Sequence, residues 1–217
     1  VMDDPWITFR YARNLLEGRG LVFNPGEPVE GYSNLSWVWI SAAGIFARVE
    51  PLSFARAVSW VLAAAVFWVL CFGWKRNTEG DDEPTRSGTA ALFLAGAYPF
   101  AVWTMGGLET ILHAALLLLF ALVLAEVWNR PRSLATALLA ASLLALDVTR
   151  PEGFIWGAVV LVVAAFAWRR KSALAHLLTA FGVLAIFHVG YSAWRLAVFG
   201  SIWPNTVRAK VGGGLLS

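Results

Sequence analysis

The run Ile111-Leu-His-Ala-Ala-Leu-Leu-Leu-Leu-Phe-Ala-Leu-Val-Leu-Ala125 decides the fold class, because only His113 interrupts its apolar side chains. It lies inside a longer apolar stretch, 109–128, which matches the roughly 20 residues that an α-helix needs to cross a bilayer. A strand of a membrane barrel is about half as long. We therefore predict a membrane-spanning helix at 109–128.

Similar apolar stretches lie on both sides of this helix, at 35–49, 54–74, 88–104, 133–148, 153–168 and 173–194. They predict an all-α, polytopic transmembrane bundle of about six to seven membrane helices. The stretch 35–49 is shorter than a full span and is followed by Glu50 and Pro51. We expect it to be a short, tilted or incompletely crossing helix.

The composition agrees with a membrane protein. Of 217 residues, 59% are hydrophobic and 14% are charged, whereas a soluble domain has roughly a quarter charged residues. The 17 Lys and Arg residues lie between apolar runs and form no single patch, so we expect no nucleic-acid partner. The single cysteine, Cys71, excludes disulfides and cysteine-ligated metal sites within one chain.

The two ends suggest a fragment of a longer protein. The chain opens on Val1-Met-Asp-Asp without an initiator Met, and it stops in the glycine-rich stretch 211–217. We divide it into a first loop at 1–33, a helix bundle at 34–194 and a second, truncated loop at 195–217.

Basic residues in the loops predict the orientation, because Lys and Arg are enriched in cytoplasmic loops. The loops 75–87, 128–134 and 168–174 carry Lys75, Arg76, Arg86, Arg130, Arg132, Arg169, Arg170 and Lys171. If these loops are cytoplasmic, then 105–110, 149–153 and both predicted loops at 1–33 and 195–217 lie on the outer face. We therefore expect a multi-pass membrane protein with both predicted loops on the extracytoplasmic face.

The first loop begins with a predicted amphipathic helix. Asp4 suits the N-cap, Pro5 suits the first helical position, and Gly18 is a natural stop. At helical spacing, one side carries Arg10, Arg13, Asn14 and Glu17, and the other carries Ile7, Tyr11, Leu15 and Leu16. Such a helix is suited to lie on a membrane surface.

Polar residues cluster in the segments that we place on the outer face. Polar side chains at membrane depth are costly and are usually functional. The candidate site residues are Asp3, Asp4, Arg10, Asn14, Asn24, Glu30, Glu109, Arg150, Glu152, Arg195, Asn205, Arg208 and Lys210. Two adjacent carboxylates, Asp3 and Asp4, suit a general base or a hard cation equally well, so we assign no metal and leave metal dependence open.

The opening segment, from Asp3-Asp4-Pro-Trp-Ile-Thr-Phe-Arg10 through Asn24-Pro-Gly-Glu-Pro-Val-Glu30-Gly-Tyr-Ser-Asn34, resembles the first loop of GT-C superfamily membrane glycosyltransferases. Within that superfamily it is similar to the terminal arabinofuranosyltransferase group, and this resemblance implies a protein of the bacterial plasma membrane with an extracytoplasmic active face. Later landmarks occur in the matching order: Gly106-Gly-Leu-Glu109-Thr, Thr149-Arg150-Pro-Glu152-Gly and Pro204-Asn205-Thr.

The resemblance implies transfer of a sugar from a polyprenyl-phosphate donor to an extracytoplasmic glycan or lipid acceptor. It implies that Asp3 or Asp4 is the general base, and direct displacement would invert the anomeric carbon. A departing lipid phosphate needs cationic partners, for which Arg195, Arg208 and Lys210, and then Arg150, are the candidates. The remaining candidates, Arg10, Asn14, Asn24, Glu30, Glu109, Glu152 and Asn205, either bind substrate or hold the structure.

Several alternatives stay open. Asp4 suits a simple helix cap, Arg195 an interfacial anchor, and Arg150 with Glu152 a structural clamp. Glu109 and His113 lie one helical turn apart, which fits a local hydrogen bond better than a metal site. The chain as a whole also fits a transporter fragment or a non-catalytic membrane scaffold.

Overall fold

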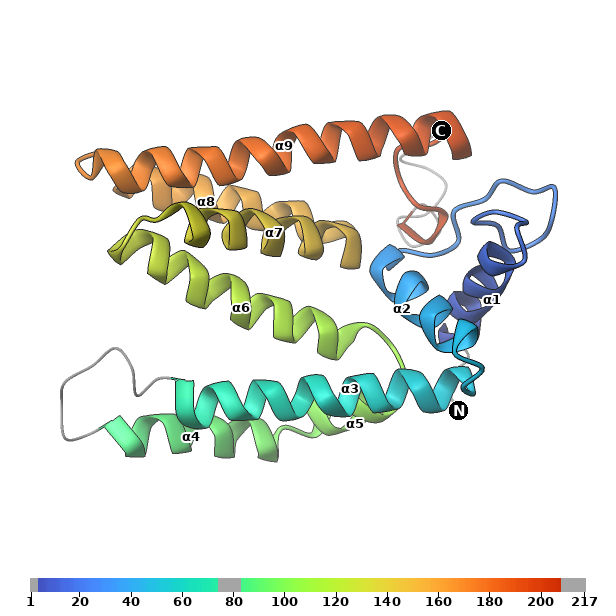
Figure 1. Ribbon diagram of the computed structural model, residues 1–217, viewed down its shortest axis with the longest axis horizontal. Helices are drawn as coiled ribbons and strands as arrows, with labels where there is room; N and C mark the ends of the chain where they lie inside the picture. The colour runs from blue at the N-terminus through green and yellow to red at the C-terminus, as the bar shows by residue number, and fades with distance from the viewer. Residues whose placement is uncertain (1–3, 74–82, 208–217) are drawn as a thin grey trace.

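The computed structural model describes residues 4–73 and 83–207, and in these ranges every regular element is a helix (Figure 1). The elements are α1 (Asp4–Leu16), α2 (Leu35–Phe46), α3 (Pro51–Trp68) with a π-helical end η1 (Val69–Gly73), α4 (Glu83–Gly96), α5 (Tyr98–Gly106), α6 (Thr110–Asn129), α7 (Ser133–Thr149), a 3₁₀ turn η3 (Pro151–Phe154), α8 (Ile155–Phe166) and α9 (Lys171–Phe199). The predicted all-α fold class is confirmed.

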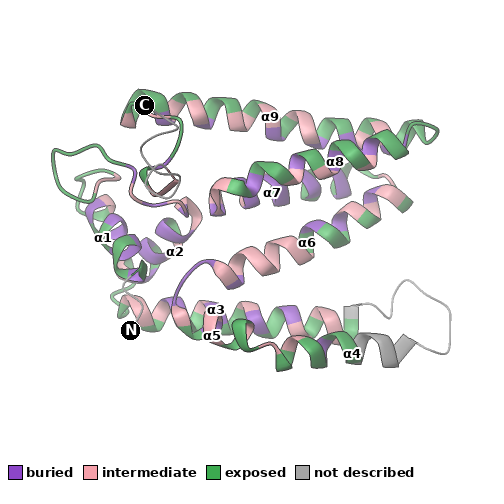
Figure 2. Ribbon diagram, turned by 180° about the vertical axis from the view of Figure 1, so that it is seen from behind, coloured by how far each residue is buried: buried purple, intermediate pink, exposed green. Residues whose placement is uncertain are grey.

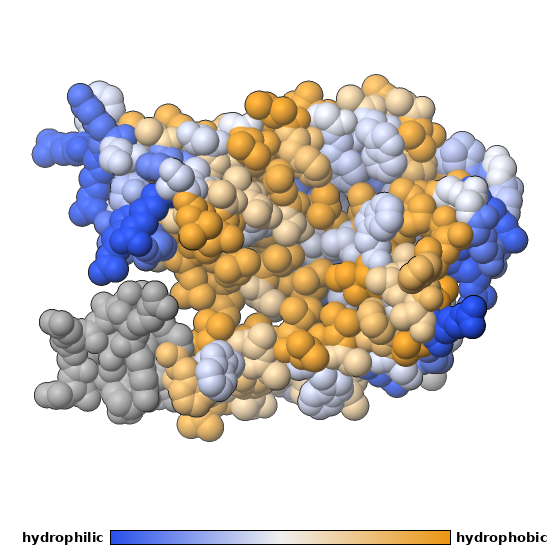
Figure 3. All heavy atoms as spheres, viewed as in Figure 1, coloured by the Kyte–Doolittle hydropathy of each residue, from blue (hydrophilic) through white to orange (hydrophobic). Residues whose placement is uncertain are grey.

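The elements divide the molecule into two polar ends and an apolar middle. Helices α1 and α2, the α5–α6 connection, η3 and the end of α9 lie at one end, which we call the site end (Figure 1). The α6–α7 and α8–α9 connections lie at the other, the basic end, which carries Arg130, Arg132 and 169–171. In Figure 3 hydrophobic side chains fill the space between hydrophilic ends, as expected for a bundle embedded in a bilayer.

The main core lies between α6, α7, α8 and α9. Leu139, Leu143 and Leu146 of α7 are fully buried there, against Val160 of α8 and Leu177 of α9. Helix α3 buries Ala55, Ser59, Ala63 and Val66, and the rest of its surface is intermediate or exposed (Figure 2). At its site end, the bundle of α6 to α9 carries Glu109 just before α6 and Arg150 just after α7.

The number of full-length membrane helices is smaller than the sequence predicts. Within the described ranges, three helices are long and apolar enough to cross a membrane, namely the continuous α3–η1 helix, α6 and α9, or four if α4 and α5 form one bent span. Helices α7 and α8 are apolar but shorter, with 17 and 12 residues. The expected six to seven spans are corrected to these three or four.

Helix α2 matches the expectation of a short helix. It has 12 residues, which corresponds to about 18 Å, against the roughly 30 Å of a hydrocarbon core. It lies across the site end beside α1 (Figure 1). A short α2 keeps the first loop at the same end as Glu109 and Arg150.

The predicted helix at 88–104 is wrong in its shape. The chain forms two helices there, the second part of α4 and α5, which meet at an angle of 64°. Pro99 in the first turn of α5 has no amide hydrogen and cannot continue the preceding helix. Helix α4 also begins at Glu83, inside the loop predicted at 75–87, while residues 74–82 lie outside the described ranges.

Helix α9 continues beyond position 194, where we predicted the end of the bundle. It runs to Phe199 and ends at Gly200, whose left-handed φ of 69° suits a glycine C-cap. Arg195 therefore lies in the last turns of a helix, and the second loop begins at Gly200.

Gly153 allows η3 to pack directly on α7. A Cβ at this position would overlap the backbone carbonyl of Leu146. We expect Gly153→Ala to lower the free energy of unfolding by about 1–3 kcal/mol or more, as overpacking does. Reversible unfolding in mixed detergent micelles measures this.

Gly182→Ala is the matched control, because Gly182 lies within α9 and a Cβ there meets nothing within 4 Å. Alanine is favoured over glycine in a helix by roughly 0.5–1 kcal/mol. Equal stability of the two variants would show that η3 is not held against α7 as described.

Candidate active site

A cavity of about 500 Å³ opens at the site end. Its walls come from α1, from the end of the first loop, from the α5–α6 connection and from Arg150. The lining includes Asp4, Thr8, Tyr32, Ser33, Asn34, Trp103, Glu109, Arg150 and Thr206. We call this cavity the Asp4 cavity.

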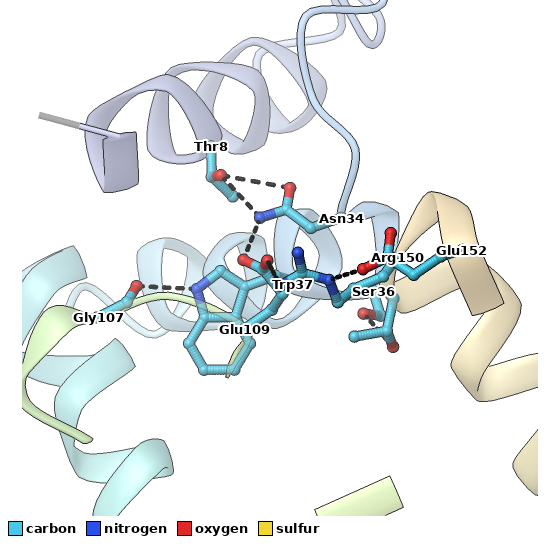
Figure 4. Close-up of polar contacts among 9 residues, drawn as sticks. Thr8, Asn34, Ser36, Trp37, Gly107, Glu109, Arg150 and Glu152 are labelled. Atoms are coloured by element: carbon cyan, nitrogen blue, oxygen red, sulfur yellow. Dashed lines mark hydrogen bonds and ion pairs between the residues drawn. The ribbon is translucent and has the colours of Figure 1, made fainter. Parts of the chain in front are cut away.

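A continuous set of polar contacts connects four segments at this cavity (Figure 4). The side-chain amide of Asn34 donates to Glu109 Oε2 at 2.8 Å and to Thr8 Oγ1 at 3.3 Å. Arg150 donates through Nη1 to Glu109 Oε1 at 3.3 Å and through Nε to Glu152 Oε1 at 2.6 Å. Glu109 is thereby held between the first loop and the end of α7.

The α5–α6 turn that carries Glu109 is held by α2. Gly107 adopts a left-handed φ of 74°, a conformation that favours glycine. The buried indole of Trp37 in α2 donates to the Gly107 carbonyl at 2.9 Å. Ser36 hydrogen-bonds Thr149 at 2.9 Å, so α2 connects this turn to the end of α7.

Glu109 contributes a buried carboxylate to the cavity, and Arg150 contributes a partly exposed guanidinium. The Glu109 side chain is 11% exposed and that of Arg150 is 35% exposed. Partial burial works against ionisation of Glu152, but hydrogen bonds from its own backbone and from Arg150 prevail and hold its pKa below the usual value. Arg150 therefore hydrogen-bonds the carboxylates of Glu109 and Glu152, and its Nη2 has no partner among the described residues.

Asn34 is expected to stabilise this arrangement. In Asn34→Ala, Glu109 Oε2 loses its amide donor in a buried setting, so we expect a loss of about 1–3 kcal/mol in unfolding free energy. Asn24→Ala is the control, since the exposed amide of Asn24 bonds only Arg10 and Glu27. A shift in denaturation midpoint as small as that of the control would contradict the role given to Asn34.

The predicted acidic pair is only partly described. Asp4 is exposed at the start of α1 and lines the cavity. Asp3 lies outside the described residues, as do Arg208 and Lys210. Asp4, Glu109 and Arg150 are thus the predicted site residues that share this cavity, and Glu152 contacts it through Arg150.

Arg195 and Glu30 form a separate buried pair behind the cavity wall. Arg195 Nε donates to Glu30 Oε1 at 3.0 Å, and their side chains are 8% and 2% exposed. The Arg195 guanidinium also lies over the Tyr191 ring. Arg195 does not line the Asp4 cavity.

This pair fixes the end of the described chain to the first loop. The backbone N–H of Asn205 donates to the backbone carbonyl of Glu30 at 2.9 Å, next to Thr206 in the cavity wall. Burial raises the pKa of Glu30, and the charge of Arg195 offsets part of that shift. Glu30 therefore connects the first loop to α9 through its carboxylate and to Asn205 through its carbonyl, beside Tyr32 in the cavity wall.

Arg10, Asn14 and Asn24 hold the first loop in shape. Arg10 donates to the Phe23 carbonyl at 2.8 Å and to Asn24 Oδ1 at 3.3 Å. Asn14 donates to the carbonyls of Val22 and Phe23. None of the three lines the Asp4 cavity.

The loop contacts also correct the predicted faces of α1. Asn14, placed on the polar side, is buried, and Ile7 and Leu16, placed on the apolar side, are exposed. Asn14 is buried because its side-chain amide hydrogen-bonds two carbonyls of the first loop instead of water. Helical spacing cannot reveal this, because the loop that covers Asn14 follows the helix.

Three residues at the site are absent from the candidate list: Asn34 and Trp37, which hydrogen-bond there, and Thr206, which lines the cavity. Asn34 ends the Gly-Tyr-Ser-Asn run and could have been chosen from its place before α2. Nothing in the sequence singles out the indole of Trp37 or the hydroxyl of Thr206. Among the described residues, no three His, Cys, Asp or Glu side chains gather closely enough to hold a metal ion.

Comparison with known proteins finds a relative that aligns with nearly the whole chain. An alignment of 235 residues, covering 99% of this chain, is 30% identical to the terminal β-(1→2)-arabinofuranosyltransferase of Mycobacterium tuberculosis. The protein of the same name from Corynebacterium glutamicum is 36% identical over 73 residues, or 32% of this chain and 11% of that protein.

No protein-family model matches the chain, and no solved structure gives a significant match. The chain spans only 35% of the M. tuberculosis relative. Along almost its entire length, this helical membrane chain is therefore similar to about a third of a terminal arabinofuranosyltransferase.

Proposed function

We propose that the chain carries the active site of a membrane glycosyltransferase. The observation that carries this proposal is the convergence of Asp4, Glu109 and Arg150 on one cavity. These residues come from distant parts of the sequence, and both relatives are named as arabinofuranosyltransferases. The substrates would be a polyprenyl-phosphate sugar donor and a glycan or lipid acceptor at the outer face of the bacterial plasma membrane.

Asp4 is the proposed general base, with Asp3 as the alternative. An exposed carboxylate at the cavity can take the proton of an acceptor hydroxyl as its oxygen attacks the anomeric carbon. The new glycosidic bond forms as the bond from the anomeric carbon to the phosphate oxygen breaks. Direct displacement inverts that carbon and releases the polyprenyl phosphate.

Arg150 is the proposed partner of the leaving phosphate. Its Nε and Nη1 hold Glu152 and Glu109, and its Nη2 retains donors that can stabilise the charge growing on the phosphate. Arg208 and Lys210 stay candidates for the same task. Arg195 would act through the wall that it holds together with Glu30.

The direct test is an assay of the protein reconstituted in liposomes with a radiolabelled polyprenyl-phosphate arabinose donor and an arabinan acceptor. We expect labelled acceptor to accumulate with inverted anomeric configuration. Arg150→Gln should slow the transfer, and no transfer by the wild-type protein with this or a hexose donor would contradict the proposal.

A further inference from the structure

A second cavity, of about 600 Å³, lies on the opposite side of α1 from the Asp4 cavity. It is bounded by α1, by the segment 17–23 and by the start of α3 at Pro51. Ile7 lines both cavities. We call the second one the Arg13 cavity.

The two cavities differ in charge. Arg10, Arg13 and Arg19 line the Arg13 cavity against the single carboxylate of Glu17, which gives a formal charge of three minus one, or +2. The Asp4 cavity is lined by two carboxylates, Asp4 and Glu109, and one guanidinium, Arg150, for a formal charge of −1. The Arg13 cavity therefore favours an anion.

Arg13 is the cation that is free to bind it. Arg10 is engaged by the loop through Phe23 and Asn24, and Arg19 forms an ion pair with Glu17 at 2.7 Å. Arg13 is exposed, and its guanidinium has no hydrogen bond or ion pair with any residue in the described ranges. Its planar guanidinium matches the geometry of a phosphate group.

The N-terminus of α3 adds little to this charge. Glu50 accepts hydrogen bonds from the amides of Leu52 and Ser53, so the first turn of α3 is already capped. The attraction for an anion must therefore come from the arginines.

The rest of the lining suits an amphiphilic ligand. Trp6, Phe9 and Phe23 contribute apolar surface, and Trp6 is half exposed. Helix α1 lies at the site end, beside the apolar middle of the molecule (Figures 1 and 3). Tryptophan and arginine at that level are typical of side chains that meet lipid head groups.

We propose that the Arg13 cavity binds the phosphate of an anionic phospholipid head group, with Arg13 as its main contact. The bound lipid holds α1 and the segment 17–23 at the membrane surface. This site is separate from sugar transfer and does not depend on it.

Hydrogen exchange of the protein in nanodiscs tests the proposal. Three conditions are compared: phosphatidylcholine alone, phosphatidylcholine with phosphatidylglycerol, and phosphatidylcholine with inorganic phosphate in the buffer. We expect phosphatidylglycerol to slow exchange of the amides in 17–23 about fivefold when the lipid is about four times its Kd, because a ligand slows local opening by 1 + [L]/Kd.

Arg13→Gln should abolish most of this slowing, and Arg13→Lys should retain part of it. Arg132→Gln, which removes the same charge at the basic end, should leave it intact. Equal exchange in the two lipid mixtures, or equal loss in Arg13→Gln and Arg132→Gln, would overturn the proposal. Protection by inorganic phosphate with no further gain from phosphatidylglycerol would also overturn the assignment to a lipid.

Discussion

Asp4→Asn is expected to lower the rate of sugar transfer by about 10²–10⁴-fold, the range typical of losing a general base. Asparagine keeps the size of the side chain but cannot take a proton from the attacking hydroxyl. Asp4 is exposed, so the change should cost little stability. Initial rates at saturating donor, with unfolding measured in parallel, separate the two effects.

Two further variants make this result interpretable. Glu27→Gln removes an exposed carboxylate of the same loop that does not line the Asp4 cavity, and it should transfer sugar at the wild-type rate. Asp3→Asn tests the other member of the acidic pair. Normal transfer by both Asp3→Asn and Asp4→Asn would exclude the proposed base.

Arg195→Leu is expected to lower the free energy of unfolding by about 3–5 kcal/mol. The variant leaves Glu30 as a buried carboxylate without its cation, and Glu30 Oε2 already has no partner among the described residues. Transfer should also slow, because the segment of Glu30 and Tyr32 in the cavity wall loses its ion pair with α9. Reversible unfolding in mixed micelles measures the stability.

The double variant Glu30→Leu/Arg195→Leu separates a buried charge from a loss of packing. Replacing a buried ion pair by apolar side chains is often close to neutral, so the double variant should be more stable than Arg195→Leu. If it is less stable than Arg195→Leu, the loss in the single variant does not come from an unpaired Glu30.

The deficit of Arg195→Leu should shrink at acid pH. Burial raises the pKa of Glu30 above the usual value of a glutamate, and loss of the Arg195 charge raises that pKa further. In the variant, the folded state then binds more protons than the unfolded state at pH values above 4.5, so its stability rises as the pH falls through the folded pKa. A deficit that grows as the pH falls from 8 to 5 would contradict this.

The sequence predicted the fold class because long apolar runs are a local signal. It predicted a short α2 because the apolar run that begins at Leu35 ends after about 15 residues, before Glu50 and Pro51. It overestimated the number of spans because it counted the stretches 133–148 and 153–168 as spans although their helices are too short, and because Pro99 breaks the stretch 88–104 without making it polar. Apolar composition alone does not distinguish a continuous helix from two shorter ones.

The site was harder to predict because its residues meet only through tertiary structure. The predicted topology placed Glu109 and Arg150 at the same end as Asp4. It did not reveal that Asn34 connects Glu109 to Thr8 through hydrogen bonds. Arg195 was a candidate for phosphate binding because it is a cation in the segment that we placed on the outer face. Its burial against Glu30 depends on a pairing between the first loop and the last helix, which no local pattern reveals.

Cysteine labelling tests most directly whether the Asp4 cavity is the outward-facing site of transfer. In a Cys71→Ser background, Ser33→Cys places a thiol in the cavity wall, and Ser133→Cys places one at the basic end. A membrane-impermeant maleimide added outside sealed vesicles should modify only Ser33→Cys and should stop its sugar transfer. Labelling of Ser33→Cys only from the inside, or full transfer after it is labelled, would contradict the proposed site.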